Sequence, residues 1–331
     1  MPQLNPNDSD AVLGGQTPPP VNALVLGGGT AGAKLQIANE WGMSYELVDR
    51  LSQTHQIFSF ETVKVNDLGE IIKRTKKSAF YYTEDIGNGI GLDMVYIPSG
   101  SYMMGSPASK SGEENKNEII RYEKKPPQLV NISAFYMAKH LTTQEQYQSI
   151  MAENPSKFRG NKRPVEQVDW CKAKECCSAL KRRSNKKYVL PSESQWEYAC
   201  RSGTTTLFYC GDMITSDLAN YDSKFRYKSQ KLGINIPQTT DVDKFPPNSF
   251  GLYDVHGNVS EWCGDFWNPH VPKDERPWVH EDSWWSPNAY AGYLSRGGSW
   301  FSFLDDCRSA SRINGFKIPS HIGFRVACLL E

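Results

Sequence analysis

The chain has 331 residues, 37 Lys plus Arg, 37 Asp plus Glu and a formal net charge of zero. Because no excess of positive charge attracts phosphate, this composition argues against a nucleic-acid partner. No apolar run approaches the roughly 20 residues that span a bilayer, and residues 1–6 lack the basic and apolar parts of a secretory signal. We therefore expect no membrane insertion and a cytoplasmic location.

The cysteines and histidines show no spacing typical of a metal site or a disulfide framework. Eight cysteines occur without a Cys-x-x-Cys pair, and six histidines stand singly without His-x-x-x-His spacing. Cysteines within helix-like and strand-like patterns usually pack as small hydrophobes. We expect most thiols to be reduced and buried, and we expect no imidazole metal site.

Residues 1–90 are predicted to form a small N-terminal segment with three parts. Residues 1–20 are polar and rich in proline, which is typical of a flexible leader. A short helix is expected at about residues 33–41. Residues 58–83 alternate in polarity like strands around an Asn-Asp-Leu-Gly turn, which indicates a small strand-rich part.

A glycine motif precedes the expected helix. Three glycines satisfy the G-x-G-x-x-G spacing of a dinucleotide-binding turn, namely Gly27, Gly29 and Gly32. Asp49 follows a strand-like stretch at residues 45–48, as an acidic residue does in such folds. Residues 51–91, however, offer only extended and hairpin-like segments instead of further strand and helix units. We favour a simple glycine turn, and nucleotide binding stays a further alternative.

From residue 91 the pattern changes to two strand-like pieces around a Pro-Ser-Gly turn, followed by three predicted helices. Capping boxes mark the start of two of these helices, and an aspartate that can cap the helix marks the start of the third. The predicted helices run from the box at 142–145 to about Met151, from near Asp169 onward, and from the box at 192–195 to Gly203.

The last forty or so residues contain two short blocks with a different kind of sequence between them. Residues 296–300 read Arg-Gly-Gly-Ser-Trp and residues 322–326 read Ile-Gly-Phe-Arg-Val. Residues 301–321 show neither strand alternation nor helix periodicity, yet they carry more apolar and aromatic side chains than a solvated loop favours. An exposed surface of this kind is typical of a binding site.

These blocks, in this order, resemble the formylglycine-generating enzyme family, also called the sulfatase-modifying-factor domain. The resemblance covers residues 91–328 and rests on the blocks 94–100, 164–170, 190–199, 245–254, 257–262, 296–300 and 322–326. It implies an α+β, C-type-lectin-like fold with much irregular loop structure and a small N-terminal appendage. The expected division is residues 1–90 and 91–331, and the fold by itself implies no activity.

The resemblance also shows where the chain departs from the family's enzymes. Those copper oxidases use two cysteine thiolates. Aligned on the Arg-Ser-Ala-Ser-Arg stretch at 308–312, the two positions fall on Leu304 and Ser309, so both thiols are absent. Cys307 alone cannot supply the pair. We predict that the protein is not an enzyme, and the alternative is a copper oxidase or related oxygenase with a rearranged site.

A structural calcium ion is a second implication of the resemblance. The family's calcium loop matches residues 254–261. Asp254 and Glu261 would offer carboxylates and Gly257 and Val259 carbonyl oxygens, which are the hard donors that Ca²⁺ prefers.

Within the family, the chain is most similar to the variable proteins of diversity-generating retroelements, whose C-terminal segment is rewritten through mutation of adenines. Residues 296–326 have that layout, and between 301 and 321 only Lys317 lies outside the amino acids that mutated adenine-adenine-pyrimidine codons yield. The leader also resembles leaders of cyanobacterial proteins. The resemblance implies a non-catalytic protein that binds varied ligands, for which we expect a protein or a peptide.

We expect residues 301–321 to form the ligand-binding face, held at its ends by buried Trp300, Ile322, Phe324 and Val326. The alternative is that the aromatic side chains fold back into ordinary core. The predicted contact residues are Phe301, Phe303, Asp305, Asp306, Ser309, Ser311, Ile313, Asn314, Phe316, Ile318, Ser320 and His321.

Overall fold

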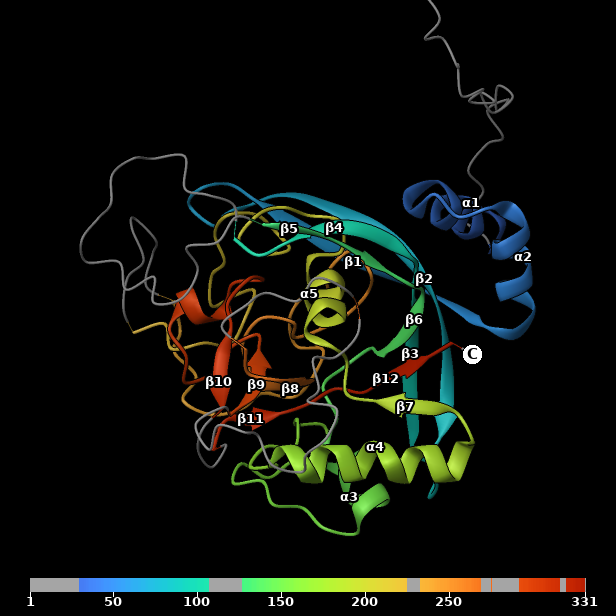
Figure 1. The fold of residues 1–331 in the computed structure, drawn as a ribbon. Coiled ribbons are helices and arrows are strands. Elements are labelled where there is room, and N and C mark those ends of the chain that lie inside the picture. The colour runs from blue at the N-terminus through green and yellow to red at the C-terminus, as the bar shows by residue number, and fades with distance from the viewer. Residues whose placement is uncertain are drawn as a thin grey trace, which may run out of the picture.

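The computed structural model describes residues 30–106, 127–224, 233–268, 275, 292–315 and 320–330. These residues form a mixed structure of helices and sheets joined by much irregular chain, as predicted (Figure 1). Gly27, Gly29, Phe316 and Ile318 lie outside the described residues. None of the helices in the described ranges is long and apolar enough to cross a membrane.

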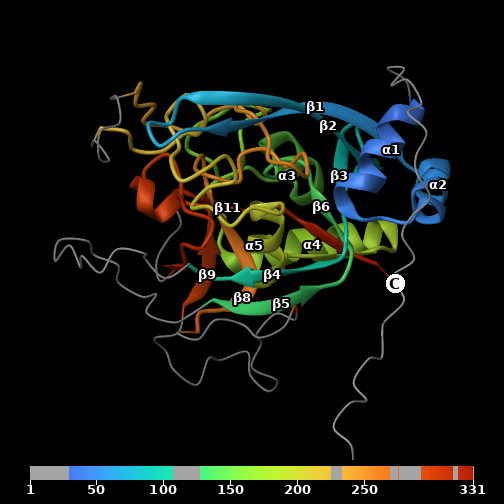
Figure 2. The ribbon, with the colours of Figure 1, turned by 90° about the horizontal axis from the view of Figure 1, so that it is seen from above.

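A six-stranded sheet organises the molecule, with the order β1-β2-β3-β6-β12-β7 and antiparallel pairing throughout. Its strands are β1 (Gln56–Val65), β2 (Ile71–Asp85), β3 (Gly91–Ile97), β6 (Phe135–Ala138), β7 (Lys187–Val189) and β12 (Ala327–Leu329). Because β2 pairs with β3, the strands expected for the N-terminal segment extend the same sheet that holds β12. Figure 2 shows β1 and β2 as a long ribbon along one side of the molecule.

Both faces of this sheet are buried at β3, so β3 reads as a nearly continuous apolar run. Met94 and Tyr96 belong to one hydrophobic cluster, together with residues of α1 (Thr30–Trp41), α2 (Tyr45–Thr54), α3 (Gln144–Met151) and α4 (Trp170–Ser184). Val95 and Ile97 belong to the other, together with residues of α5 (Glu193–Arg201). The sheet therefore separates two cores.

Two smaller sheets complete the structure. One has the order β10-β9-β8-β11, formed by β8 (Ser260–Phe266), β9 (Tyr293–Arg296), β10 (Ile313–Gly315) and β11 (Ile322–Gly323). The other pairs β4 (Gly100–Met104) with β5 (Gln128–Ile132) and packs on α5. A short 3-10 turn, η1 (Leu304–Cys307), lies within residues 296–326, which we call the C-terminal segment.

The strand-like stretch at residues 45–48 is a helix, which corrects the sequence interpretation. Ser44 caps α2 by accepting a hydrogen bond from the Leu47 amide, and Val48 and Leu51 lie buried one turn apart. Asp49 is on this helix, 3.6 Å from Lys34 in an exposed ion pair. A dinucleotide fold would need a strand at this point, so the structure gives the glycine motif no such context.

The other helix predictions agree with the structure, with one shift. Helix α4 starts after Asp169, whose side chain accepts from the Lys172 amide. The capping box of α5 uses Ser192 and Gln195 as predicted, but that of α3 uses Thr143 and Gln146, one residue later than residues 142–145.

The shifted cap gives a matched pair of variants. Thr143→Val should lower the free energy of unfolding by about 1 kcal/mol, because the valine loses the hydrogen bond to the Gln146 amide. Thr142→Val should be neutral or stabilising, because the buried Thr142 hydroxyl has no partner among the described residues. Urea unfolding of both variants measures the difference, and equal losses would contradict the assignment of the cap.

Candidate functional site

The C-terminal segment begins at a buried arginine that binds the acidic side of α5. Arg296 is 0% exposed, its guanidinium pairs with Glu197, and its Nε lies 3.4 Å from Glu193. Arg312, further along the segment, binds both carboxylate oxygens of Glu193 at 2.5 and 2.8 Å. Such charge-assisted bonds fix both distance and orientation. The start and middle of the segment are therefore held by the same helix.

A second buried arginine holds the other end of the segment. Arg325 is 0% exposed and donates to both carboxylate oxygens of Glu261 on β8 at 2.6 and 2.9 Å. Its Nη2 also donates to the Tyr253 carbonyl at 2.8 Å. The predicted anchors Ile322, Phe324 and Val326 are all buried beside it.

The turn after Arg296 brings the chain close to the 3-10 turn. Gly298 has φ +69°, and a Cβ at this position would lie 2.5 Å from the Cys307 sulfur. His256 supports the same place, since its Nδ1 lies 2.8 Å from the Cys307 carbonyl while its Nε2 accepts from the Tyr209 amide. Burial lowers the pKa of His256 to about 3, so this ring is a neutral structural link.

Between the two anchored ends, aromatic side chains reach the surface. Phe301 is 60% exposed and Phe303 57% exposed, so they are not core residues. Trp300 is half-buried, which corrects its predicted burial, and its ring centroid lies 5.4 Å from that of Phe301. The centroid of the His321 ring lies 5.9 Å from that of Phe301. We call these three contacting rings, together with the exposed Phe303 two residues further along the chain, the aromatic face.

Several predicted contact residues lie elsewhere. Ser309 and Ser311 are buried, so neither side chain belongs to the surface. Their backbone carbonyls accept hydrogen bonds from the Arg296 guanidinium. Ile313 and Asn314 lie on β10, at the opposite edge of the four-stranded sheet from β11. Three strand spacings, roughly 14 Å, separate these edges. The predicted face is therefore divided into two places.

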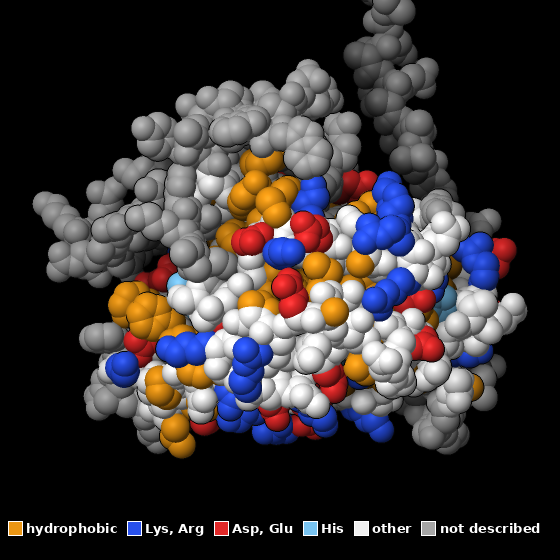
Figure 3. All heavy atoms as spheres, turned by 90° about the horizontal axis from the view of Figure 1, so that it is seen from below, with side chains coloured by type: hydrophobic (Ala, Val, Ile, Leu, Met, Phe, Trp, Pro, Cys, Tyr) orange, Lys and Arg blue, Asp and Glu red, His pale blue; other side chains and the backbone are white. Residues whose placement is uncertain are grey.

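The remaining predicted contact residues, Asp305, Asp306 and Ser320, are neighbours of Phe303 and His321 along the chain. Asp305 and Ser320 are exposed, and Asp306 is half-buried. Figure 3 shows that hydrophobic side chains on the face seen from below gather in separate groups, with charged side chains of both signs between them.

Sequence reasoning missed one aromatic neighbour of this face. The Phe158 ring lies 5.4 Å from the Trp300 ring, edge to face at 89°. Phe158 comes from the loop after α3 and not from the C-terminal segment. No spacing in the sequence relates these two positions, because only the tertiary fold brings them together.

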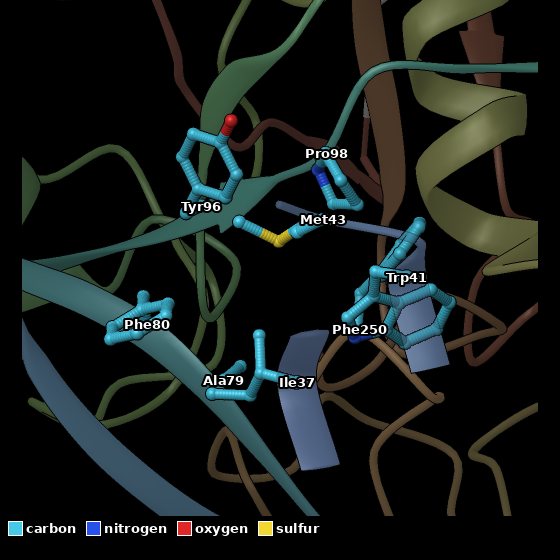
Figure 4. Close-up of a pocket in the computed structure, with 8 residues that line it drawn as sticks. All are labelled: Ile37, Trp41, Met43, Ala79, Phe80, Tyr96, Pro98 and Phe250. Carbon is cyan, nitrogen blue, oxygen red and sulfur yellow. The ribbon is translucent and has the colours of Figure 1, made fainter. Parts of the chain in front are cut away.

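A small apolar pocket lies at a different place, beside α1 (Figure 4). Ile37 and Trp41 of α1 line it together with Ala79 and Phe80 of β2, and the Trp41 ring lies 4.4 Å from the Phe250 ring. Its other lining residues are Met43, Tyr96, Pro98 and Phe250. The lining is almost entirely apolar, so it offers few groups for orienting a polar ligand.

Comparison with known proteins identifies the family. The model of the sulfatase-modifying factor enzyme 1-like domain matches residues 88–329. The chain belongs to this family. It is 28% identical over 255 residues to the chaperone protein LppX of Paenibacillus barcinonensis, covering 64% of this chain and 80% of LppX. It is 30% identical over 173 residues to the mouse formylglycine-generating enzyme, covering 50% of this chain and 44% of that enzyme.

A solved structure supports the same assignment. Treponema denticola variable protein 1 superposes with a TM-score of 0.59 at 26% identity, covering 76% of this chain and 99% of that protein. The fold is thus the C-type-lectin-like fold of the formylglycine-generating enzyme type, as the resemblance implied. The chain is similar both to an enzyme of the family and to a variable protein, so the similarity alone does not decide the activity.

The two positions matched to the family's catalytic thiols carry no sulfur in this chain, and both are buried. Leu304 is 6% exposed and Ser309 0% exposed. Cys307 is also buried, and burial raises the pKa of its thiol well above the usual range, so it stays protonated. Cys200 lies 3.7 Å from the Ser309 hydroxyl, and burial raises the pKa of this thiol to about 12. Both thiols are therefore protonated at neutral pH, and neither is exposed.

The predicted calcium loop is bonded internally. Both carboxylate oxygens of Glu261 face Arg325, and the Asp254 carboxylate accepts from the Asp243 amide at 3.1 Å and from the Asn258 side chain at 3.3 Å. The described residues contain no group of three or more His, Cys, Asp or Glu side chains that could hold a metal ion. Glu261 therefore fits its arginine better than a cation, and calcium binding by Asp254, Gly257, Val259 and Glu261 stays a prediction.

A substitution separates the two roles of Glu261. Glu261→Gln should lower the free energy of unfolding by roughly 3 to 5 kcal/mol, because it leaves buried Arg325 without its partner charge. The loss should be the same with calcium and with chelator. Glu61→Gln, which breaks the exposed pair with Arg74, should cost less than about 1 kcal/mol. A loss that Glu261→Gln shows only in calcium would identify it as a calcium ligand instead.

Proposed function

We propose that this protein is a non-catalytic ligand-binding protein whose aromatic face binds a protein or peptide. The exposure of Phe301 and Phe303 carries the proposal, because two large aromatic rings exposed on one short segment are costly unless a partner covers them. Aromatic residues beside polar ones are also the composition of protein-binding surfaces.

The way the segment is anchored supports a surface that tolerates change. Arg296 and Arg325 fix both ends through buried ion pairs that do not involve Phe301 or Phe303. Side chains on the aromatic face can therefore vary without disturbing the core. We infer that residues 301–321 are diversified, as in variable proteins of retroelements, and a near copy of their coding sequence beside a reverse-transcriptase gene is the genetic feature that tests this.

A double variant tests the binding role. Phe301→Ser with Phe303→Asn should shift the free energy of unfolding by no more than about 0.5 kcal/mol, as is usual for surface positions. The probe is a phage-displayed library of random peptides selected on the wild-type protein. Peptides selected in this way should lose binding to the double variant, measured by fluorescence anisotropy.

The control replaces two exposed apolar residues of the β4-β5 sheet. Met103 and Leu129 are 48% and 63% exposed and lie opposite each other in the strand register. Met103→Ser with Leu129→Asn should retain peptide binding. If the wild-type protein enriches no peptide, or if both double variants bind equally well, the aromatic face is not the binding site.

The enzymatic alternative makes a different prediction. Purified protein loaded with copper should not oxidise a Cys-x-Pro-x-Arg peptide, the substrate that the family resemblance implies, because Cys307 is buried and the positions of both family thiols lack sulfur. Mass spectrometry detects formylglycine as the product. Turnover that disappears in Cys307→Ala would establish the oxidase in place of the binding protein.

A further inference from the structure

Phe158 extends the aromatic face beyond the C-terminal segment. Its ring meets Trp300 at 5.4 Å, Trp300 meets Phe301 at 5.4 Å, and Phe301 meets His321 at 5.9 Å. The four rings form one row of contacts, contributed by three separate parts of the chain. Trp300 and Phe301 follow Arg296, which is held by its buried ion pairs. Phe158 belongs to a different loop, which other buried side chains hold in place.

A buried carboxylate holds the backbone on one side of Phe158. Glu166 is 0% exposed, and its Oε1 accepts hydrogen bonds from the amides of Lys157 and Phe158, the latter at 2.9 Å. The Glu166 amide in turn donates to the Ser156 hydroxyl at 3.2 Å. Burying a carboxylate is costly, and here it serves to order the backbone of an outer loop.

A buried glutamine holds the other side. Gln144 is 2% exposed, and its amide nitrogen donates to the Phe158 carbonyl at 2.7 Å. Its side-chain oxygen accepts from Asn154 at 3.0 Å and from the Gly160 amide at 3.2 Å. Both backbone groups of Phe158 are thus bound by buried side chains, so the ring is presented at a fixed place.

The loop around Phe158 is positively charged. Residues 157–163 contain Lys157, Arg159, Lys162 and Arg163 and no acidic residue. Lys157 and Arg159 are exposed, and the Lys157 ammonium lies 5.2 Å from the Phe158 ring centroid. An apolar ring beside exposed cations complements a ligand group that combines an apolar side chain with a carboxylate.

We infer that Phe158, with Lys157 and Arg159, forms a fixed subsite that takes an apolar side chain next to an acidic residue of the ligand peptide. This inference rests on the proposed function. A preorganised ring binds without the entropic cost of ordering a loop. The subsite would then supply a constant contact, while residues 301–321 supply the variable ones. Glu166 acts as a positioning residue.

Two substitutions test the subsite with a fluorescein-labelled peptide selected on the wild-type protein. Phe158→Ala should raise Kd at least about tenfold, the effect expected of an aromatic hot spot. Lys157→Gln removes only an exposed charge, so folding should be unaffected, while the peptide's affinity should fall and depend less on salt. Selected peptides should also be enriched in Asp or Glu beside aromatic or aliphatic residues. Leu129→Ala, on β5, is the matched truncation control and should bind normally.

Glu166 has a separate test. Glu166→Ala should weaken peptide binding although Phe158 is present, and Glu166→Gln should restore it, because the glutamine oxygen can accept the same amide hydrogen bonds. The NMR signal of the Trp300 indole N–H reports on the ring contact, and it should broaden or shift in Glu166→Ala but not in Glu166→Gln. A purely structural role would lower the melting temperature without moving this signal.

The outcomes separate the subsite from the proposed function. If Phe301→Ser with Phe303→Asn abolishes peptide binding while Lys157→Gln and Phe158→Ala bind like wild type, the subsite is wrong and the binding function stands. If none of these variants changes binding, both ideas fail. If Phe158→Ala does not fold, the test of the subsite rests on the other two measurements. The subsite is then wrong if Lys157→Gln binds like wild type and the selected peptides show no enrichment in Asp or Glu.

Discussion

Buried ion pairs between arginines of the C-terminal segment and fixed acids constrain this structure most. Glu193 and Glu197 of α5 bind Arg296 and Arg312, and Glu261 of β8 binds Arg325. Removing one partner would leave a charge in the core, so neither end of the segment can move independently of the scaffold. Between these anchors Leu304 and Cys307 pack into the core, whereas Phe301 and Phe303 are exposed.

Local signals in the sequence predict the helices well and the sheet poorly. The caps at Asp169 and Ser192 were recognisable because a cap is a contact between residues three apart. The stretch at 45–48 fits a strand as well as a helix because four residues cannot distinguish the two periods, and the structure shows a helix capped by Ser44. The place of β1 and β2 in the main sheet depends on pairing with β3, which no local pattern reveals.

The proposed binding surface shows the same division. Its aromatic character could be predicted from composition alone, and Phe301 and Phe303 are exposed as expected. Which polar residues join them depends on strand order, which places Asn314 at the far edge and buries Ser309. The role of Phe158 could not be predicted from the sequence, because its contact with Trp300 joins two loops that only the folded chain brings together.

The position of β12 has a consequence for how such a segment can be rewritten. This strand follows residues 301–321 in the chain, yet it lies inside the main sheet between β6 and β7. A frameshift or stop codon within the segment would remove β12 and leave β6 and β7 without their shared neighbour. If residues 301–321 are diversified as proposed, only changes that preserve the reading frame leave a chain that can complete this sheet.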